Sequence, residues 1–201
     1  MLDQKLLTVF EKEHPQFGAL LLIMLPVHSA GMILSQVPIS MAFELVLRII
    51  NTQNIDTDIL EKITRKLYPE FDIAIERLSI DKYDVILEIL LHTDYIRRRE
   101  IILELRETQG IFLSYPGVLI IEDISKINPS LLCHILSKIK LDEITTILRI
   151  TPENIKELIF SCYSKEEVLE IESNLEWAGA VPLDTIAHTC QKIVTLINNV
   201  I

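Results

Sequence analysis

The chain has little glycine, few aromatic side chains and little positive charge. Only 5 of its 201 residues are glycine, and 6% are Phe, Trp or Tyr. The net charge of −10 disfavours nucleic-acid binding, because clustered Lys and Arg side chains are what hold a phosphate backbone. With 49% hydrophobic residues, the composition predicts an ordered protein that buries substantial cores.

Cysteine is scarce and forms no recognisable framework. Cys133, Cys162 and Cys190 are odd in number, widely spaced and without a Cys-x-x-Cys pair. This usage is typical of a reducing compartment, so we expect all three to be packing residues. The first residues lack the basic and apolar regions of a signal peptide, and we expect no export.

Enzymatic motifs are missing as well. The sequence has no nucleophile elbow, phosphate-binding loop or metal motif. None of the five histidines has a second ligand at a recognised metal spacing, and the adjacent Cys133 and His134 would point about 100° apart on a helix. The sequence therefore predicts no catalysis, no cofactor and no metal.

Apolar residues recur at helical spacing along most of the chain, and period-two alternation is nearly absent. This pattern predicts an all-α fold of short helices in armadillo-like, right-handed superhelical stacks. The expected helices cover 3–12, 15–25, 27–35, 39–51, 56–68, 81–91, 95–108, 128–139, 141–149, 152–162, 165–178 and 185–200.

Helical periodicity weakens before residue 80, which places a domain boundary there. We expect a first domain over 1–70, a linker over 71–79 and a second domain over 80–201. The second domain divides again into 80–116 and 117–201, because Gly110, Pro116 and Gly117 interrupt the periodicity. These three residues form a candidate hinge.

Several positions carry helix start or stop signals. Caps are expected at His14, Asn128 and Thr151, each directly before Pro, at Asp184, and at the Ser164–Glu167 pair, which has capping-box spacing. Gly179 is expected to end a helix in left-handed conformation, and Trp177 to fill the core beside it.

No charged residue occurs from Pro15 to Phe43, a segment long enough to cross ~30 Å of hydrocarbon. Pro26, His28 and Pro38 divide it into shorter helices. We therefore predict a buried helical core and no membrane insertion.

Arg97, Arg98 and Arg99 form the main basic cluster. Glu100 and other glutamates follow at pairing distances along the same helix, which predicts a solvated, self-compensated face.

Glu13, His14, Pro15 and Gln16 form a polar tetrapeptide directly ahead of a strongly apolar helix. Pro is well tolerated in the first helical turn, so a plain helix start is one interpretation. The other is a docking surface where a buried helix meets solvent.

The tetrapeptide, the apolar helix after it and the run Val46-Leu47-Arg48-Ile49-Ile50 resemble the middle domain of the flagellar motor switch family FliG. From Val118 to Ile201 the chain resembles the C-terminal domain of that family, and Gly179-Ala180-Val181-Pro182-Leu183 is similar to its Gly-Pro-Val turn.

The resemblance implies a structural subunit whose armadillo-like domains end in a six-helix part at 117–201. It implies that Glu13, His14, Pro15 and Gln16 bind a FliM-like rotor protein, and that copies of the chain form a ring. The location implied is cytoplasmic, peripheral to the inner membrane within a basal body or secretion assembly. We expect no counterpart of the family's N-terminal, ring-docking domain, because the sequence begins almost at the middle domain.

The segment 128–139 departs from the family's charged torque helix, with which we align it. Lys138 is its one fixed charge, and Ser130 and His134 stand where the family has ionised side chains. We expect Ser130, Leu131, His134 and Lys138 to form a candidate interaction helix, which packs in the core or binds a partner through Leu131, Leu132 and Ile135 instead of through charge pairs.

The alternative function is therefore a non-torque adaptor or scaffold in a related bacterial secretion or membrane-associated assembly. It keeps the docking role of the tetrapeptide and loses the motor role.

Overall fold

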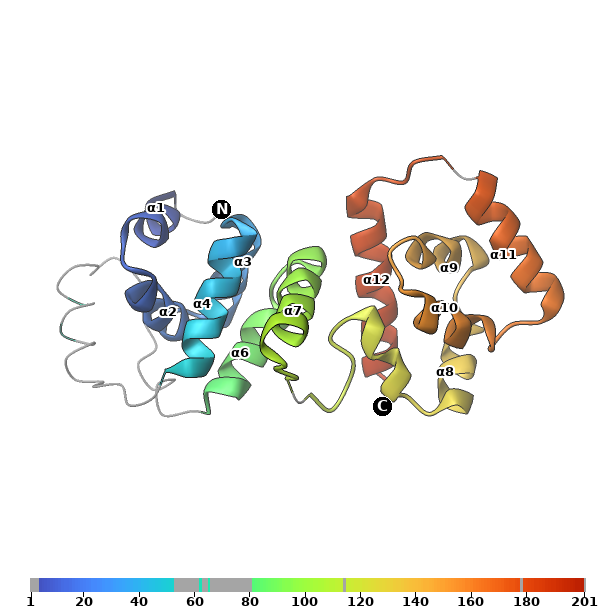
Figure 1. The fold of residues 1–201 in the computed structure, drawn as a ribbon, viewed down its shortest axis with the longest axis horizontal. Coiled ribbons are helices and arrows are strands. Elements are labelled where there is room, and N and C mark those ends of the chain that lie inside the picture. Colours follow the sequence, from blue (N-terminus) through green and yellow to red (C-terminus); the bar gives the residue numbers. More distant parts are fainter. Residues whose placement is uncertain are drawn as a thin grey trace. The chain divides into compact units, whose positions relative to one another are not determined.

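The computed structural model describes residues 4–52, 62, 65, 81–113, 115–177 and 179–200. Within these ranges every regular element is a helix and none is a strand, which confirms the all-α class (Figure 1). The chain divides into two compact units, Met1–Ser114 and Tyr115–Ile201.

The helices follow the predicted order with small shifts at their ends. The first unit contains α1 (Gln4–Lys12), α2 (Pro15–Met24), α3 (Val27–Gln36), α4 (Ile39–Asn51), α6 (Lys82–Leu91) and α7 (Tyr95–Gln109). The second contains the 3₁₀ helix η2 (Ile121–Lys126), α8 (Pro129–Leu136), α9 (Leu141–Leu148), α10 (Glu153–Phe160), α11 (Lys165–Trp177) and α12 (Leu183–Asn198). The helix predicted at 56–68 and the linker at 71–79 lie outside the described residues, apart from positions 62 and 65.

The uncharged segment forms α2, α3 and the start of α4. Pro26 and Pro38 occupy the N-cap positions of α3 and α4, so each proline ends one helix and starts the next. In the part of the chain that the structure describes, no helix is long and apolar enough to cross a membrane. Helix α2 instead packs on α4, with Leu21, Leu22 and Met24 completely buried.

Helices α6 and α7, which the sequence analysis groups with the second domain, pack on α3 and α4 of the first unit. Gly31 allows α3 to approach the end of α6 closely. A Cβ at this position would lie 2.5 Å from the carbonyl carbon of His92, just after α6. Lys82 strengthens the junction by donating hydrogen bonds to the carbonyls of Ile50 and Thr52 at the end of α4.

The basic cluster on α7 is only partly solvated. Arg97 pairs with Glu100 at 3.3 Å, as predicted, but Arg98 is fully buried. The Arg98 guanidinium donates to the carbonyls of Leu90 and Leu91, at 3.5 and 3.4 Å, at the end of α6. The prediction of a wholly solvent-facing cluster is therefore wrong for Arg98.

The second unit is closed by α12, which contacts η2, α8 and α9. Asn198, at the end of α12, binds Val118 twice: its side-chain oxygen accepts from the Val118 N–H at 2.8 Å, and its amide donates to the Val118 carbonyl at 2.9 Å. Asp123 similarly accepts from the N–H groups of Leu119 and Ile120, both at 3.3 Å. The segment from Val118 to Ile121 is consequently buried within this unit.

Three of the predicted caps are present. His14 and Asn128 accept hydrogen bonds from the first backbone N–H groups of α2 and α8. The Glu167 carboxylate accepts from the Ser164 N–H at 2.8 Å, and the Ser164 hydroxyl accepts from the Glu167 N–H at 3.3 Å. The backbone hydrogen bond from Ser164 is the main cause that lowers the pKa of the Glu167 carboxyl.

Three other predictions of helix starts and stops were wrong. Thr151 binds the carbonyl of Ile147 in the helix before it, and Pro182, not Asp184, occupies the N-cap position of α12. The left-handed glycine among the described residues is Gly110, at φ +62°, and not Gly179.

Candidate docking surfaces

The tetrapeptide forms the sharp junction between α1 and α2. Glu13 and His14 are exposed, and Pro15 is the first residue of α2. The His14 Nδ1 atom accepts from the Gln16 N–H at 3.2 Å, which requires Nδ1 to be unprotonated and leaves the Nε2 edge for other contacts. Two polar side chains are thus presented at a fixed helix start.

Gln16 has a different role, because it joins α2 to α4. Its amide donates to the Thr52 hydroxyl at 3.0 Å, and its oxygen accepts from Arg48 at 3.4 Å. Arg48 also pairs with Glu44 at 2.7 Å, and both of these side chains remain partly exposed. We call Glu13, His14, Gln16, Glu44 and Arg48 the tetrapeptide surface. Sequence spacing could not reveal the α4 residues, which lie more than twenty-five positions downstream.

The predicted hinge residues occupy different environments. Gly110 ends α7, and a Cβ there would meet nothing within 4 Å. Gly117 instead packs on Asn198, whose side-chain oxygen lies 2.4 Å from where its Cβ would be. Gly110, Pro116 and Gly117 remain candidate hinge residues, and bending there stays a prediction.

Helix α8 presents a small polar face. Ser130 and His134 of α8 and Lys138, two residues after it, are exposed, while Leu131 is half-buried. Leu132 and Ile135 are buried at 0% and 2% exposure, so these two residues pack in the core and cannot contact a partner. Of the two roles predicted for the apolar residues, Leu132 and Ile135 take the packing role, and Leu131 remains a candidate for contact with a partner.

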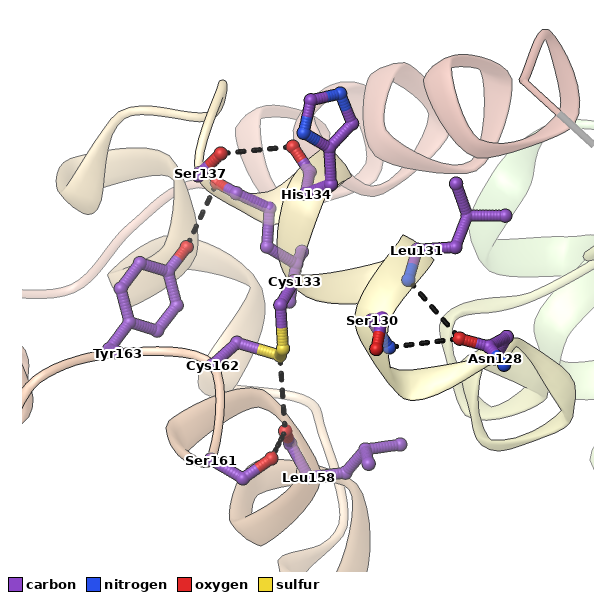
Figure 2. The surroundings of a disulfide bond; sticks show 11 residues. Asn128, Ser130, Leu131, Cys133, His134, Ser137, Leu158, Ser161, Cys162 and Tyr163 are labelled. Atoms are coloured by element: carbon purple, nitrogen blue, oxygen red, sulfur yellow. Dashed lines mark hydrogen bonds between the residues drawn. A yellow bond between two sulfur atoms is a disulfide. The ribbon is translucent and has the colours of Figure 1, made fainter.

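A disulfide joins α8 to the turn after α10. Cys133 and Cys162 are bonded, with Cα atoms 4.8 Å apart (Figure 2). The expectation that all three cysteines only pack is therefore wrong for this pair, while Cys190 is buried and takes no part in the disulfide. The two cysteines are 29 positions apart, a separation that carries no pairing signal.

Tyr163 provides a second link across the same junction. Its hydroxyl donates to the Leu136 carbonyl at 3.1 Å (Figure 2). Burial, followed by the charge of Glu167, raises the pKa of Tyr163 to about 12. Because the neutral phenol is the hydrogen-bond donor, this link persists throughout the physiological pH range.

Helix α11 is the most solvent-facing helix of the second unit in the described residues, with Ile171 its one buried residue. Trp177, at its end, is 85% exposed and therefore does not fill the core as predicted. It borders a cleft of about 390 Å³ between α9 and α11, which is also lined by Asp142, Arg149 and Asn174. The other exposed side chains are largely acidic, including Glu166, Glu170, Glu172 and Glu176.

The described residues contain no group of three or more His, Cys, Asp or Glu side chains arranged to hold a metal ion.

Comparison with known families agrees with this organisation. Residues 3–76 match the FliG middle domain, and residues 117–201 match the FliG C-terminal domain. The chain is 22% identical over 198 residues to the flagellar motor switch protein FliG of Bacillus subtilis, covering 96% of this chain and 59% of that protein. It is 25% identical over 205 residues to FliG of Aquifex aeolicus, covering 99% of this chain and 62% of that protein.

Solved structures similar to the chain carry the same name. A FliG fragment from H. pylori aligns with a TM-score of 0.42 and 17% identity, covering 100% of this chain and 92% of the fragment. Full-length FliG from Aquifex aeolicus aligns with a TM-score of 0.40 and 22% identity, covering 98% of this chain and 66% of that protein. The chain thus spans about three fifths of the length of the curated relatives it matches.

Proposed function

Because the chain belongs to the FliG family of flagellar motor switch proteins, we propose that it is a structural subunit that docks a FliM-like rotor protein through the tetrapeptide surface. In this proposal the chain is not a catalyst. It acts at the cytoplasmic side of the inner membrane, where copies of it form a ring.

The main support for this proposal is that Glu13 and His14 lie on the surface at a well-defined helix start. Both are exposed, yet the backbone beneath them is fixed by the His14 cap and by the Gln16 bonds to α4. A surface ordered before contact loses little conformational entropy on binding. The adjoining Glu44–Arg48 pair adds charged groups of both signs for a polar partner surface.

We expect the double variant Glu13→Gln, His14→Asn to bind the FliM-like protein from the same organism at least tenfold more weakly, which corresponds to about 1.4 kcal/mol. Asn is a good N-cap, so the start of α2 and the circular-dichroism spectrum should be preserved. Binding is measured by titration calorimetry on the full chain.

Glu11→Gln is the matched control, because Glu11 is an exposed acid on the adjoining helix α1. Its affinity should equal that of the unmodified chain. Unchanged affinity in the double variant would mean that the tetrapeptide is only a helix start. Gln16→Ala is unsuitable as a test, since it would also break the α2–α4 contact.

The polar, nearly uncharged face of α8 favours the second candidate, an adaptor without a torque role. Surface ion pairs each contribute only ~0–1 kcal/mol, so a motor face needs several, and the segment 128–139 carries Lys138, just after α8, as its one fixed charge. In a host lacking its own switch protein, we expect this chain to leave swimming unrestored, as measured in soft-agar motility assays.

Restored swimming that is lost with Lys138→Ala would contradict the adaptor role and assign torque to α8. Restored swimming that survives Lys138→Ala but is lost with Glu170→Gln and Glu172→Gln would also contradict it, and would assign the charged face to α11.

A further inference from the structure

We propose that Cys133 and Cys162 form a reversible redox site, which is a substrate for thiol–disulfide exchange with a dithiol. The bond joins two elements that lie 29 positions apart in the second unit. The inference rests on this pair and its surroundings, and does not depend on the proposed docking role.

The pair lies where a reductant can reach it. Cys133 and Cys162 are only partly buried, and the neighbouring Ser137 and Ser161 are exposed. Cys190, in contrast, is fully buried in α12. Exchange requires a thiolate to reach a disulfide sulfur, so accessibility separates the pair from the third cysteine.

Contacts other than the disulfide hold this part of the fold together, so it can persist when the bond is reduced. Helix α8 is held by buried Leu132, Ile135 and Leu136, and the Tyr163 hydroxyl remains bound to the Leu136 carbonyl without the disulfide. The Cys162 sulfur also lies 3.8 Å from the Leu158 carbonyl oxygen (Figure 2). A disulfide sulfur has no proton to donate there, whereas the thiol has one, so reduction adds a second donor to the Leu158 carbonyl, which already accepts from the Ser161 hydroxyl at 2.7 Å.

The reaction is balanced as a two-electron exchange. A thiolate of the dithiol attacks one sulfur of the pair, the Cys133–Cys162 bond breaks, and the released thiolate takes up a proton. The second thiol of the reagent then displaces the other cysteine, which is protonated in turn. Two electrons and two protons pass to the protein, and the reagent leaves as its own disulfide.

The bond stands alone, because the three cysteines of the sequence form no framework of several disulfides of the kind that staples small secreted domains. A bonded pair at an accessible position fits a reversible redox role better than that of a permanent staple.

The test is a redox titration of the folded full chain with reduced and oxidised dithiothreitol, quenched with N-ethylmaleimide and read by mass spectrometry. We expect two maleimide additions in the reduced form, none after reoxidation, and a nearly constant far-ultraviolet circular-dichroism signal. Cys190→Ser should give the same titration, because its thiol is shielded in both forms.

Two results would overturn the proposal. If the bond opens only in denaturant, it is a permanent staple. If the reduced chain fails to close under oxidised dithiothreitol, the two thiols are not a redox pair. Cys162→Ser is the control for the pairing. In this variant Cys133 has no partner cysteine, so its thiol should be labelled by N-ethylmaleimide under every redox condition.

Discussion

Replacing Cys133 with serine is expected to lower the free energy of unfolding of the second unit by about 3.5 kcal/mol under oxidising conditions. The bond closes a loop between positions 29 residues apart, and without it the unfolded chain regains the conformational freedom of that loop. Amide hydrogen exchange in α10 should accelerate about 300-fold, if exchange there follows unfolding of the unit.

Helix α4 of the first unit serves as the internal reference and should exchange unchanged. The sharper control is the unmodified chain after reduction, which should exchange in α10 at the same rate as the reduced Cys133→Ser variant. Equal exchange in the oxidised wild type and the variant would show that the bond contributes nothing to stability.

Gly31→Ala is expected to destabilise the first unit by about 2 kcal/mol. The added Cβ would lie 2.5 Å from the carbonyl carbon and 2.6 Å from the carbonyl oxygen of His92, and backbone atoms cannot move aside as a flexible side chain can. Overpacking of this kind typically costs about 1–3 kcal/mol, which exceeds the ~1 kcal/mol that alanine gains over glycine within a helix. Urea unfolding followed by exchange in α3 and α6 measures the effect.

Gly18→Ala is the matched control, since Gly18 is also a helical glycine in a buried position. The nearest atom to its added Cβ is the tip of the Leu45 side chain, at 3.1 Å, which can shift slightly. The helix-propensity gain should therefore leave stability unchanged or slightly higher. A loss as large as that of Gly31→Ala would mean that the close approach to His92 is not the cause.

Local signals in the sequence were sufficient to place most helices. Pro15 and Pro129 mark starts because a missing N–H does no harm in the first turn, and His14 and Asn128 supply the caps. The uncharged segment could be divided correctly at Pro26 and Pro38 for the same reason.

Signals that depend on tertiary contact were not available in the sequence. Thr151 resembles a cap, but its hydroxyl finds a closer acceptor in the carbonyl of Ile147 behind it, at 2.7 Å. Trp177 was assigned to the core because of its size, whereas α11 buries only Ile171 among its described residues and leaves the indole in solvent.

The candidate docking site could likewise be predicted only in part from the sequence. The run from Glu13 to Gln16 could be singled out by its contrast with the apolar helix that follows. Arg48 and Thr52, which hold Gln16 in place, come from the other side of the helix pair and are linked to it only by folding. The Cys133–Cys162 bond was missed because no spacing rule connects a cysteine on α8 with one in the turn after α10.

The double hydrogen bond between Asn198 and Val118 has a mechanical consequence. It joins the first buried residue of the second unit to the last turn of its final helix. If the chain were pulled from the two sides of this unit, the two Asn198–Val118 hydrogen bonds would bear the force first. Helices α8 to α11 would come under load only after these bonds had broken. The interior of the unit is in this way shielded from pulling forces transmitted along the backbone.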